Sequence, residues 1–319
     1  INLTNDILKF GYIIPNYLCH NHPIKEYYFD LSSILALSDE ITTSLIICCD
    51  KTFRPGVSVS LSGELFCHDI RPGQNLLIEA RVTKIGATLA FTEIYFISLK
   101  DKSTLARCSH IKYMKMGNLW DWMSPFIPTL LQVFLYFYDL FYKPKTTTKN
   151  VEPSLNTIFS LESVDTLQTI QRKEYKLQSY DRLLNYSENM HGGAIALAIQ
   201  EAVWKYCTEN KLPIRRIRCM EITYLSPCKG SLHISVTPYQ HLEPTTTLKT
   251  SPPKRKDRSP KNEHEEENER NDSITYSPMN EYIDTFRVTI FKQSKSNNKK
   301  PTHKNQILVQ SILILYENQ

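Results

Sequence analysis

The stretch PGVSVSLSGELFCHDIRPGQNLLIEARVTKIGATLAFTEIYF, residues 55–96, carries the pattern from which the fold follows. Val57, Val59 and Leu61 alternate with serines, which is the period-two pattern of a strand with one buried face. The run LLIEARV at 76–82 alternates in the same way. Two strands of one antiparallel sheet are therefore expected here.

Two further runs extend the pattern. Residues 88–99 are rich in aromatic and β-branched side chains, and 107–114 closes the set. Turn residues separate the runs, with Arg71-Pro72-Gly73 after the first and Gly86 after the second. The pattern predicts an antiparallel meander over 56–116.

The second half of the chain repeats the same order of elements. Apolar residues at a nearly helical spacing predict a helix over 31–47, before the first strands, and AIALAIQEAVWKY at 194–206 is apolar almost all round, as in a buried helix. Four strand-like runs follow the second helix, at 218–225, 231–238, 282–291 and 306–316. Each half therefore reads as one helix followed by four strands, which indicates an internal duplication.

The composition excludes several classes of protein. The chain has 319 residues, 41% of them hydrophobic, and a net charge of +5, so it is neither wholly disordered nor basic enough to predict nucleic-acid binding. Its 8 cysteines form no C-x-x-C pair, so we expect buried free thiols and no metal site. Free thiols favour an intracellular location, cytoplasmic or mitochondrial.

Two segments interrupt the repeated pattern. Residues 117–154 form an apolar, aromatic linker that includes FIPTLLQVFLYFYDLFY, and we expect a connecting helix packed on the protein, with weak membrane contact through 119–143 as the secondary interpretation. Residues 242–280 contain a basic cluster followed by an acidic one and almost no apolar side chains. They predict a disordered, solvated insertion between two strands, with phosphate or membrane binding as the alternative.

One short motif points to chemistry. His191-Gly192-Gly193 comes directly before the second predicted helix. The first turn of a helix has free N–H groups and a partial positive charge, and glycine allows a ligand to approach the backbone closely. The motif suits an oxyanion hole, although a tight turn with an ordinary histidine gives the same pattern.

These motifs together resemble the hotdog-fold thioesterases of the PaaI and THEM type. That family has a G-V-S-V strand, here Gly56–Val59, and a K-x-G-x-T-L-A-F hairpin, here Lys84–Phe91. It also has N-x-x-x-x-x-H-G-G before its central helix, here Asn185 to Gly193. The resemblance covers most of 24–116 and 180–240, plus the last strands.

The resemblance implies an α+β fold of two tandem hotdog domains, each an antiparallel sheet wrapped around a central helix. The first domain would cover 1–116 and the second 155–319. We expect the two domains to pack as an intramolecular pseudo-dimer, with their sheets joined edge to edge.

The family's acidic residue lies nine positions after the motif histidine, and this chain divides the motif between its halves. The second half keeps the histidine and both glycines but has Gln200 at the acid position, whereas the first half has Asp39 there and Asp30-Leu31-Ser32 in place of His-Gly-Gly. Because family active sites lie at a dimer interface, the two incomplete halves would assemble one composite site. The mirror site, with Ile24, Asp30, Leu31 and Gln200, should be inactive.

The resemblance assigns a role to each residue of the composite site. Gly192 N–H would bind the thioester carbonyl, and Asp39 would activate water or attack directly. Asn185 would orient the water or the thioester, and Ser58 would hold the water or hydrogen-bond Asp39. His191 would mainly shape the turn. The family pattern also assigns substrate contacts to Gly193, Thr42 and Thr43.

Without the resemblance, the same residues have ordinary interpretations. Asp39 would be a solvated or capping carboxylate, Asn185 a turn residue and Ser58 an alternating strand position. Arg107, His110 and Lys112 lie at the end of the last strand of the first half. They would meet coenzyme A phosphates or, more simply, form a charged strand edge.

The function implied is hydrolysis of acyl-CoA thioesters, with coenzyme A entering only as part of the substrate and with no other cofactor. Acyl-CoA is the expected partner, together with further homo-oligomerisation of the fused pair. Three alternatives stay open: a hotdog dehydratase or hydratase, a non-catalytic acyl-CoA-binding or scaffold protein, and a membrane-associated interaction protein.

Overall fold

The structure is a computed structural model of the 319-residue chain. It describes residues 2–4, 6–21, 27–67, 69–115, 117, 120, 122, 126, 161–164, 172–178, 183–184, 189–239, 284–292 and 306–316.

The elements of the first half are β1 (Asn2–Thr4), β2 (Ile7–Ile13), a 3-10 turn (Asn16–Leu18), β3 (His20–Asn21), β4 (Tyr27–Tyr28), α1 (Leu31–Cys49), β5 (Val57–Leu65), β6 (Asn75–Ile85), β7 (Leu89–Ser98) and β8 (Thr104–Tyr113). Those of the second half are β9 (Leu161–Val164), β10 (Lys173–Gln178), α4 (Gly192–Glu209), β11 (Arg216–Tyr224), β12 (Ser231–Tyr239), β13 (Asp284–Lys292) and β14 (Gln306–Tyr316). The predicted order of one helix and four strands in each half is confirmed, with additional strands before each helix.

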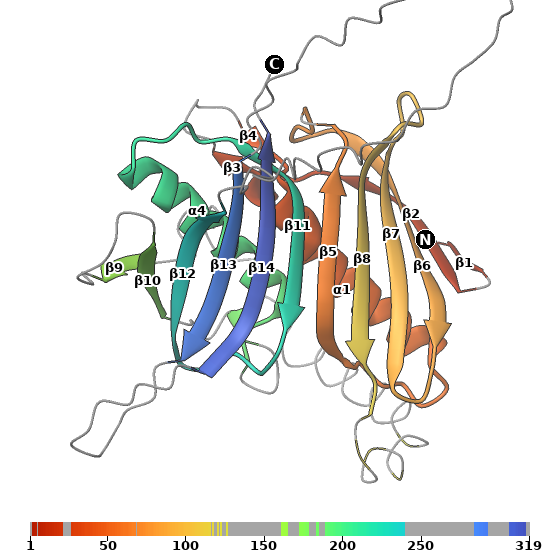
Figure 1. Ribbon diagram of the computed structural model, residues 1–319. Coiled ribbons are helices and arrows are strands. Elements are labelled where there is room, and N and C mark those ends of the chain that lie inside the picture. The colour runs from red at the N-terminus through yellow and green to blue at the C-terminus, as the bar shows by residue number, and fades with distance from the viewer. Residues whose placement is uncertain are drawn as a thin grey trace, which may run out of the picture.

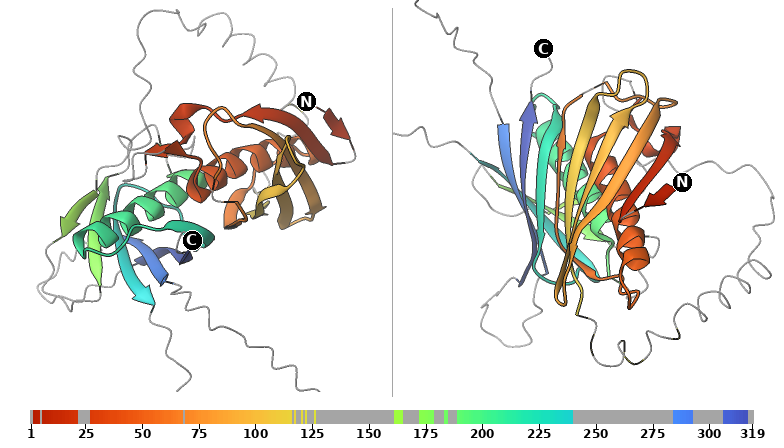
Figure 2. Two further views of the ribbon diagram at one scale, coloured as in Figure 1. Left: turned by 90° about the horizontal axis from the view of Figure 1, so that it is seen from above. Right: turned by 90° about the vertical axis from the view of Figure 1, so that its right-hand side faces the viewer.

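In the described part of the chain, one 12-stranded antiparallel sheet carries both halves, in the order β1-β2-β6-β7-β8-β5-β11-β14-β13-β12-β10-β9. The two helices lie on the same face of this sheet, and each half of the sheet curves around its own helix (Figures 1 and 2). This is the α+β arrangement expected of a tandem hotdog pair.

The two half-sheets join through β5 and β11, which pair antiparallel with Leu61 opposite Ile222 and Ser60 opposite Thr223. The predicted edge-to-edge junction is therefore confirmed. Both Leu61 and Ile222 are fully buried, so the hydrophobic core continues across the junction. The shared sheet and core hold the two halves as an intramolecular pair.

The predicted meander is wrong at one strand. β6, β7 and β8 follow one another as hairpins, but β5 pairs with β8 and not with β6. The second edge of β6 pairs with β2, and β5 lies at the opposite end of this half-sheet, between β8 and β11. β8 therefore lies inside the sheet, between β7 and β5. The polar side chains on one of its faces point toward α1.

Helix α1 is the central helix of the first half. In the described residues it is the one helix long and apolar enough to cross a membrane by composition, and most of it is buried. Its contacts with β5, β6, β7 and β8 account for that apolar character. Helix α4 occupies the equivalent place in the second half, and the two helices also pack on each other (Figure 2).

All eight cysteines are described, and all are free thiols. Cys19, Cys108, Cys207 and Cys228 are buried as expected, whereas Cys48 is exposed. Most of the linker 117–154 and the whole insertion 242–280 lie outside the described residues, so the expectations for them remain predictions.

Candidate active site

The carboxylate of Asp39 is the centre of the site. It projects from the middle of α1 and is 1% exposed. Its Oδ2 atom accepts a hydrogen bond from the backbone N–H of Gly193 at 3.0 Å and lies 3.1 Å from Nδ1 of His191. Its Oδ1 atom lies 3.3 Å from the Ser58 hydroxyl. Both halves of the chain therefore surround one buried carboxylate.

The N-terminus of α4 meets the middle of α1 because two glycines begin α4. A Cβ atom on Gly193 would lie 2.5 Å from Cα of Ala36, and one on Gly192 would lie 2.9 Å from Oδ2 of Asp39. Neither position has room for a side chain. The first N–H groups of a helix have no partner within the helix and favour an anion, so this terminus is a suitable seat for the carboxylate.

Two side chains of β8 face Asp39 from the sheet. His110 and Lys112 are 1% and 4% exposed, and Nε2 of His110 and Nζ of Lys112 each lie 3.5 Å from Oδ1 of Asp39. The interpretation of these residues as a charged strand edge is therefore wrong, because β8 is an interior strand. Arg107 lies on the outer face of the sheet, where it forms an ion pair with Glu93.

A chain of hydrogen bonds connects α1 with β5 through His110. The Thr42 hydroxyl donates to the Ser38 carbonyl at 2.6 Å, so it accepts from Nδ1 of His110 at 2.7 Å. The other ring nitrogen then accepts a hydrogen bond, and the Ser58 hydroxyl lies 3.0 Å from it. Ser58 has one hydroxyl hydrogen and two acceptors, His110 and Asp39.

These contacts place Thr42 and Thr43 differently from the prediction. Thr42 is fully buried and orients His110, and the Thr43 hydroxyl donates to the backbone carbonyl of Asp39 at 2.5 Å. The N–H of Gly193, which was assigned to substrate, is used by Asp39. The three residues therefore make contacts within the protein that support the site, and their contacts with substrate stay predictions.

The electrostatics of the cluster favour an ionised Asp39. Burial alone would raise the pKa of Asp39, but the hydrogen bond from His191 and the charges of His110, Lys112 and His191 at the acidic pH where Asp39 titrates more than offset it and hold that pKa well below its usual range. Burial, reinforced by the neighbouring Lys112, lowers the pKa of His110 to about 3. His110 is therefore a neutral imidazole at physiological pH.

His191 lies between two carboxylates of α1. Its Nδ1 atom is 3.1 Å from Oδ2 of Asp39, and its Nε2 atom is 3.1 Å from Oε1 of Glu40. Ionised carboxylates only accept hydrogen bonds, so both ring nitrogens must donate. The hydrogen bond with Asp39 is the main cause that raises the pKa of His191, which agrees with a protonated ring.

Tyr224 of β11 fixes the start of α4 from the other side. Its hydroxyl donates to the carbonyl of Gly192 at 2.9 Å. Burial raises the pKa of Tyr224 well above its ordinary value of 10.0, so the hydroxyl remains a donor. The backbone of Gly192 is thereby held beside Asp39 and Ser58.

Of the eight predicted site residues, Asp39, Ser58, His191, Gly192 and Gly193 lie around one point, and Thr42 and Thr43 lie behind it. Asn185 lies outside the described residues. Their proposed catalytic roles remain predictions.

Sequence reasoning missed the position of His110 and Lys112. The signal was present, since Cys108, His110 and Lys112 recur with period two and therefore share one face of the strand. Which face of the strand points toward α1 depends on the order of the strands in the sheet, which the sequence pattern does not give. No sequence pattern near Tyr224 indicated that its hydroxyl would contact Gly192.

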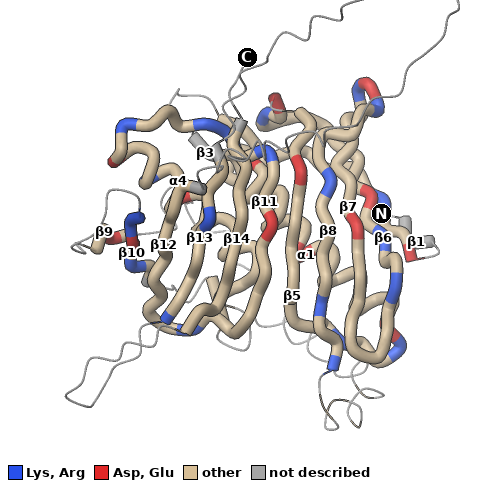
Figure 3. Tube along the Cα trace, in the orientation of Figure 1, with Lys and Arg blue, Asp and Glu red and all other residues tan. Residues whose placement is uncertain are grey.

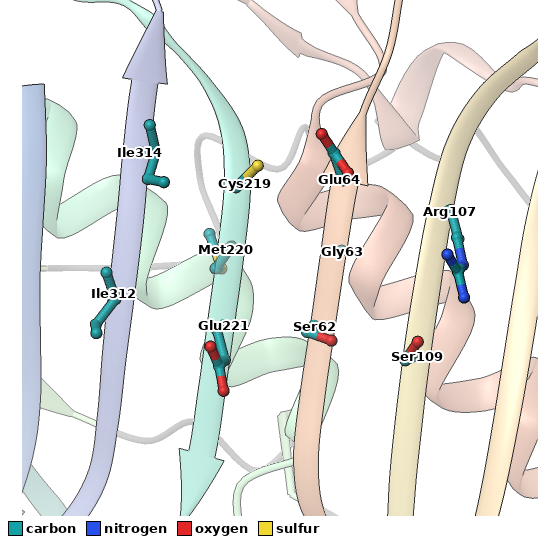
Figure 4. A pocket seen from close by; sticks show the side chains of 10 residues that line it. All are labelled: Ser62, Gly63, Glu64, Arg107, Ser109, Cys219, Met220, Glu221, Ile312 and Ile314. Carbon is teal, nitrogen blue, oxygen red and sulfur yellow. The ribbon is translucent and has the colours of Figure 1, made fainter. Parts of the chain in front are cut away.

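A separate open groove of about 380 Å³ lies over the junction of β5 and β11. Figure 4 shows Ser62, Glu64 and Arg107 on one side of it and Glu221 and Ile312 on the other, with the helices behind the sheet. Charged residues of both signs also mark strands β7, β8, β5 and β11 in Figure 3. None of the predicted site residues lines this groove.

No family model matches the chain, and no curated protein matches it by sequence. Solved structures do match over nearly its whole length. The chain is similar to a 12:0-ACP thioesterase from Umbellularia californica, with a TM-score of 0.55 and 9% identity over 99% of this chain and 100% of that one. It is also similar to a putative thioesterase from Novosphingobium aromaticivorans, with a TM-score of 0.56 and 8% identity over 99% and 100%.

A third similar structure is a conserved protein of unknown function with a hot dog fold from Alicyclobacillus acidocaldarius, with a TM-score of 0.51 and 7% identity over 98% of this chain and 94% of that one. At such identities the likeness establishes the fold.

Among the described residues, no group of three or more His, Cys, Asp or Glu side chains is arranged to hold a metal ion. The chain has the tandem hotdog fold, with a buried carboxylate where its two halves meet.

Proposed function

We propose that this protein hydrolyses acyl-CoA thioesters at a single composite site between its two hotdog halves. The observation that carries the proposal is the contact of Asp39, from the first half, with the N-terminus of α4, from the second. The backbone N–H of Gly193 and the ring of His191 both meet Oδ2 of Asp39. Hydrolysis of a thioester needs an anionic base or nucleophile beside an oxyanion site, and this junction supplies both.

The geometry is compatible with the roles that the resemblance implies. Gly192 is the first residue of α4, so its N–H is one of the helix's unpaired donors and suits the oxyanion that forms on the thioester carbonyl. Asp39 accepts the proton of an attacking water or attacks the carbonyl carbon itself. Ser58, 3.3 Å from Oδ1 of Asp39, would hold the attacking water.

The equivalent place in the other half supports a single site. The strand that corresponds to β8 is β14, and it turns Leu313 and Leu315 inward where β8 has His110 and Lys112. Leu31 begins α1 and is 1% exposed, and Gln200 of α4 is fully buried. Uncharged side chains thus occupy the positions equivalent to Asp39, His110 and Lys112, and a buried carboxylate, Asp30, stands at the position equivalent to His191.

The geometry weighs against a dehydratase or hydratase. Such an enzyme would use His191 as a base, which requires a free lone pair on one ring nitrogen. Both nitrogens of His191 face carboxylate oxygens, and its pKa is raised. The alternative of a non-catalytic acyl-CoA-binding protein shares the fold and differs only in turnover.

The test is thiol release from a panel of acyl-CoAs of graded chain length, comparing the wild type with Asp39→Asn. The matching acyl-ACP substrates form a second arm, because one structural neighbour is named as an ACP thioesterase. Turnover by the wild type that is lost in Asp39→Asn supports the proposal. Binding of acyl-CoA without turnover of any substrate would replace it with an acyl-CoA-binding protein.

A further inference from the structure

Lys112 is an unusual residue for its location. Its side chain is 5% exposed, and it extends from the interior strand β8 toward α1. Lysine is almost never fully buried without a partner, because removing an ammonium group from water costs much free energy. The partner here is Asp39, whose side chain is 2% exposed and whose Oδ1 lies 3.5 Å from Nζ.

Lys112 faces a different oxygen of Asp39 from the one that the start of α4 contacts. Gly193 and His191 both contact Oδ2, whereas Lys112 faces Oδ1, the oxygen beside Ser58. Lys112 is paired with Ser58 across β5 and β8, so the backbone register fixes their separation. Lys112 is therefore placed to orient the oxygen of Asp39 that points toward the proposed water.

The other half provides an internal comparison. Where α4 has Gln200 in place of the acid, β14 has Leu315 and Leu313 as buried inward residues. The carboxylate and the buried lysine occur together in one half, whereas the equivalent positions of the other half carry the uncharged side chains Gln200 and Leu315. This joint occurrence favours a role for Lys112 beside the carboxylate over a role in packing or phosphate binding alone.

We propose that Lys112 is a positioning residue, whose buried ammonium compensates the charge of Asp39 and directs its Oδ1 atom toward Ser58. The inference rests on the proposed function, in which Asp39 is the catalytic carboxylate. It also separates Lys112 from the coenzyme A phosphates, because a side chain enclosed with Asp39 is not available to a bulky anion.

Several other titratable groups face this pair. His110 projects from β8, His191 from the start of α4 and Tyr224 from β11, and Glu40 follows Asp39 on α1. His110 and Tyr224 are uncharged at neutral pH, since burial lowers the pKa of the first to about 3 and raises that of the second. Burial lowers the pKa of Lys112, while the charge of Asp39 and the hydrogen bond with it raise that pKa. Lys112 and His191 are the two basic side chains that remain to balance Asp39 within the described residues.

The experiment compares the wild type with Lys112→Met, Lys112→Arg and the matched control Lys115→Met, which removes an exposed lysine three residues later. The Asp39 carboxyl is titrated directly by carbon NMR, with Asp39→Asn to assign its signal. In parallel, kcat/KM for acyl-CoA hydrolysis is measured as a function of pH.

In Lys112→Met we expect the Asp39 titration and the acidic limb of kcat/KM to move up together by about one to three pH units. Lys112→Arg should largely restore both, and Lys115→Met should leave both unchanged. An Asp39 titration that stays at its wild-type pH in Lys112→Met overturns the inference. If the wild type hydrolyses no thioester, the proposed function fails, while a shifted Asp39 titration still supports the pairing.

Lys112→Met removes one of the two basic side chains that face the buried carboxylate and is the variant most at risk of unfolding. The double variant Lys112→Met with Asp39→Asn removes both charges. If the two groups are partners, the double variant melts at a higher temperature than Lys112→Met alone. Additive losses of melting temperature in the two single variants would overturn the inference.

Discussion

The backbone N–H of Gly193 donates a hydrogen bond to Oδ2 of Asp39 at 3.0 Å, although the two residues are 154 positions apart in the chain. The contact joins the start of one central helix to the middle of the other. A helix N-terminus attracts negative charge, so the contact stabilises the ionised carboxylate and also fixes the relative position of the two halves. Folding and the proposed chemistry depend on the same few atoms.

Asp39→Asn should reduce thiol release from acyl-CoA by about a hundredfold to ten-thousandfold, because an amide neither accepts the proton of water nor attacks a thioester. The matched variant Gln200→Ala changes the equivalent position of α4 and should have almost no effect on the activity of folded protein. Equal losses in the two variants would show that the assignment of a single site is wrong.

Gly193→Ala should destabilise the protein by about 1–3 kcal/mol, since the new Cβ would lie 2.5 Å from the backbone of Ala36 and the two helices would have to separate. Turnover should fall as well, because separating the helices moves the backbone N–H of residue 193 away from Asp39. Urea unfolding measures the loss. Gly11→Ala is the control, as nothing lies within 4 Å of the added Cβ. If Gly193→Ala unfolded at the same urea concentration as the wild type, the close packing of the two helices would be contradicted.

His110 should make stability depend on pH. Burial lowers its pKa to about 3, so the folded protein keeps a neutral ring while an unfolded histidine binds a proton near its ordinary value of 6.5. The stability this group contributes is fully present above about pH 6.5 and is lost as pH falls toward 3, by up to about 1.4 kcal/mol per pH unit.

Unfolding free energies measured between pH 7.5 and pH 4.5 test this expectation. The His110→Gln variant should be less stable than the wild type at pH 7.5, and its stability should fall less steeply as the pH is lowered. Identical slopes in the two proteins would mean that His110 binds its proton equally in the folded and unfolded states.

Tyr224→Phe should lower the free energy of unfolding by about 0.5–1.5 kcal/mol, because the hydroxyl no longer donates to the carbonyl of Gly192. Thiol release should fall by less than tenfold, since the backbone of Gly192 loses one constraint and no reacting group. Tyr113→Phe, at a partly exposed position on β8, is the matched control. If both variants behaved alike, the hydroxyl of Tyr224 would have no special role.

Much of the site could be predicted before any tertiary structure was known. The resemblance to the hotdog thioesterases implied that Asp39, Ser58 and the His191-Gly192-Gly193 turn would meet, because that family builds its site between two halves and this chain divides the motif between its own. The contact of Thr42 with His110 was not expected, and the predicted contact of Thr42 with substrate stays a prediction. The difference arises because a side chain's direction on a helix depends on which neighbour packs against it.

The sequence by itself determined the strands, both central helices and the duplicated order, because alternation, helical periodicity and turn residues act between near neighbours in the chain. Only the tertiary structure decided that β5 lies between β8 and β11 and that His110 and Lys112 face Asp39. Strand order and the pairing of a buried charge are settled by contacts between distant segments, which must fill one core and leave no buried charge without a partner.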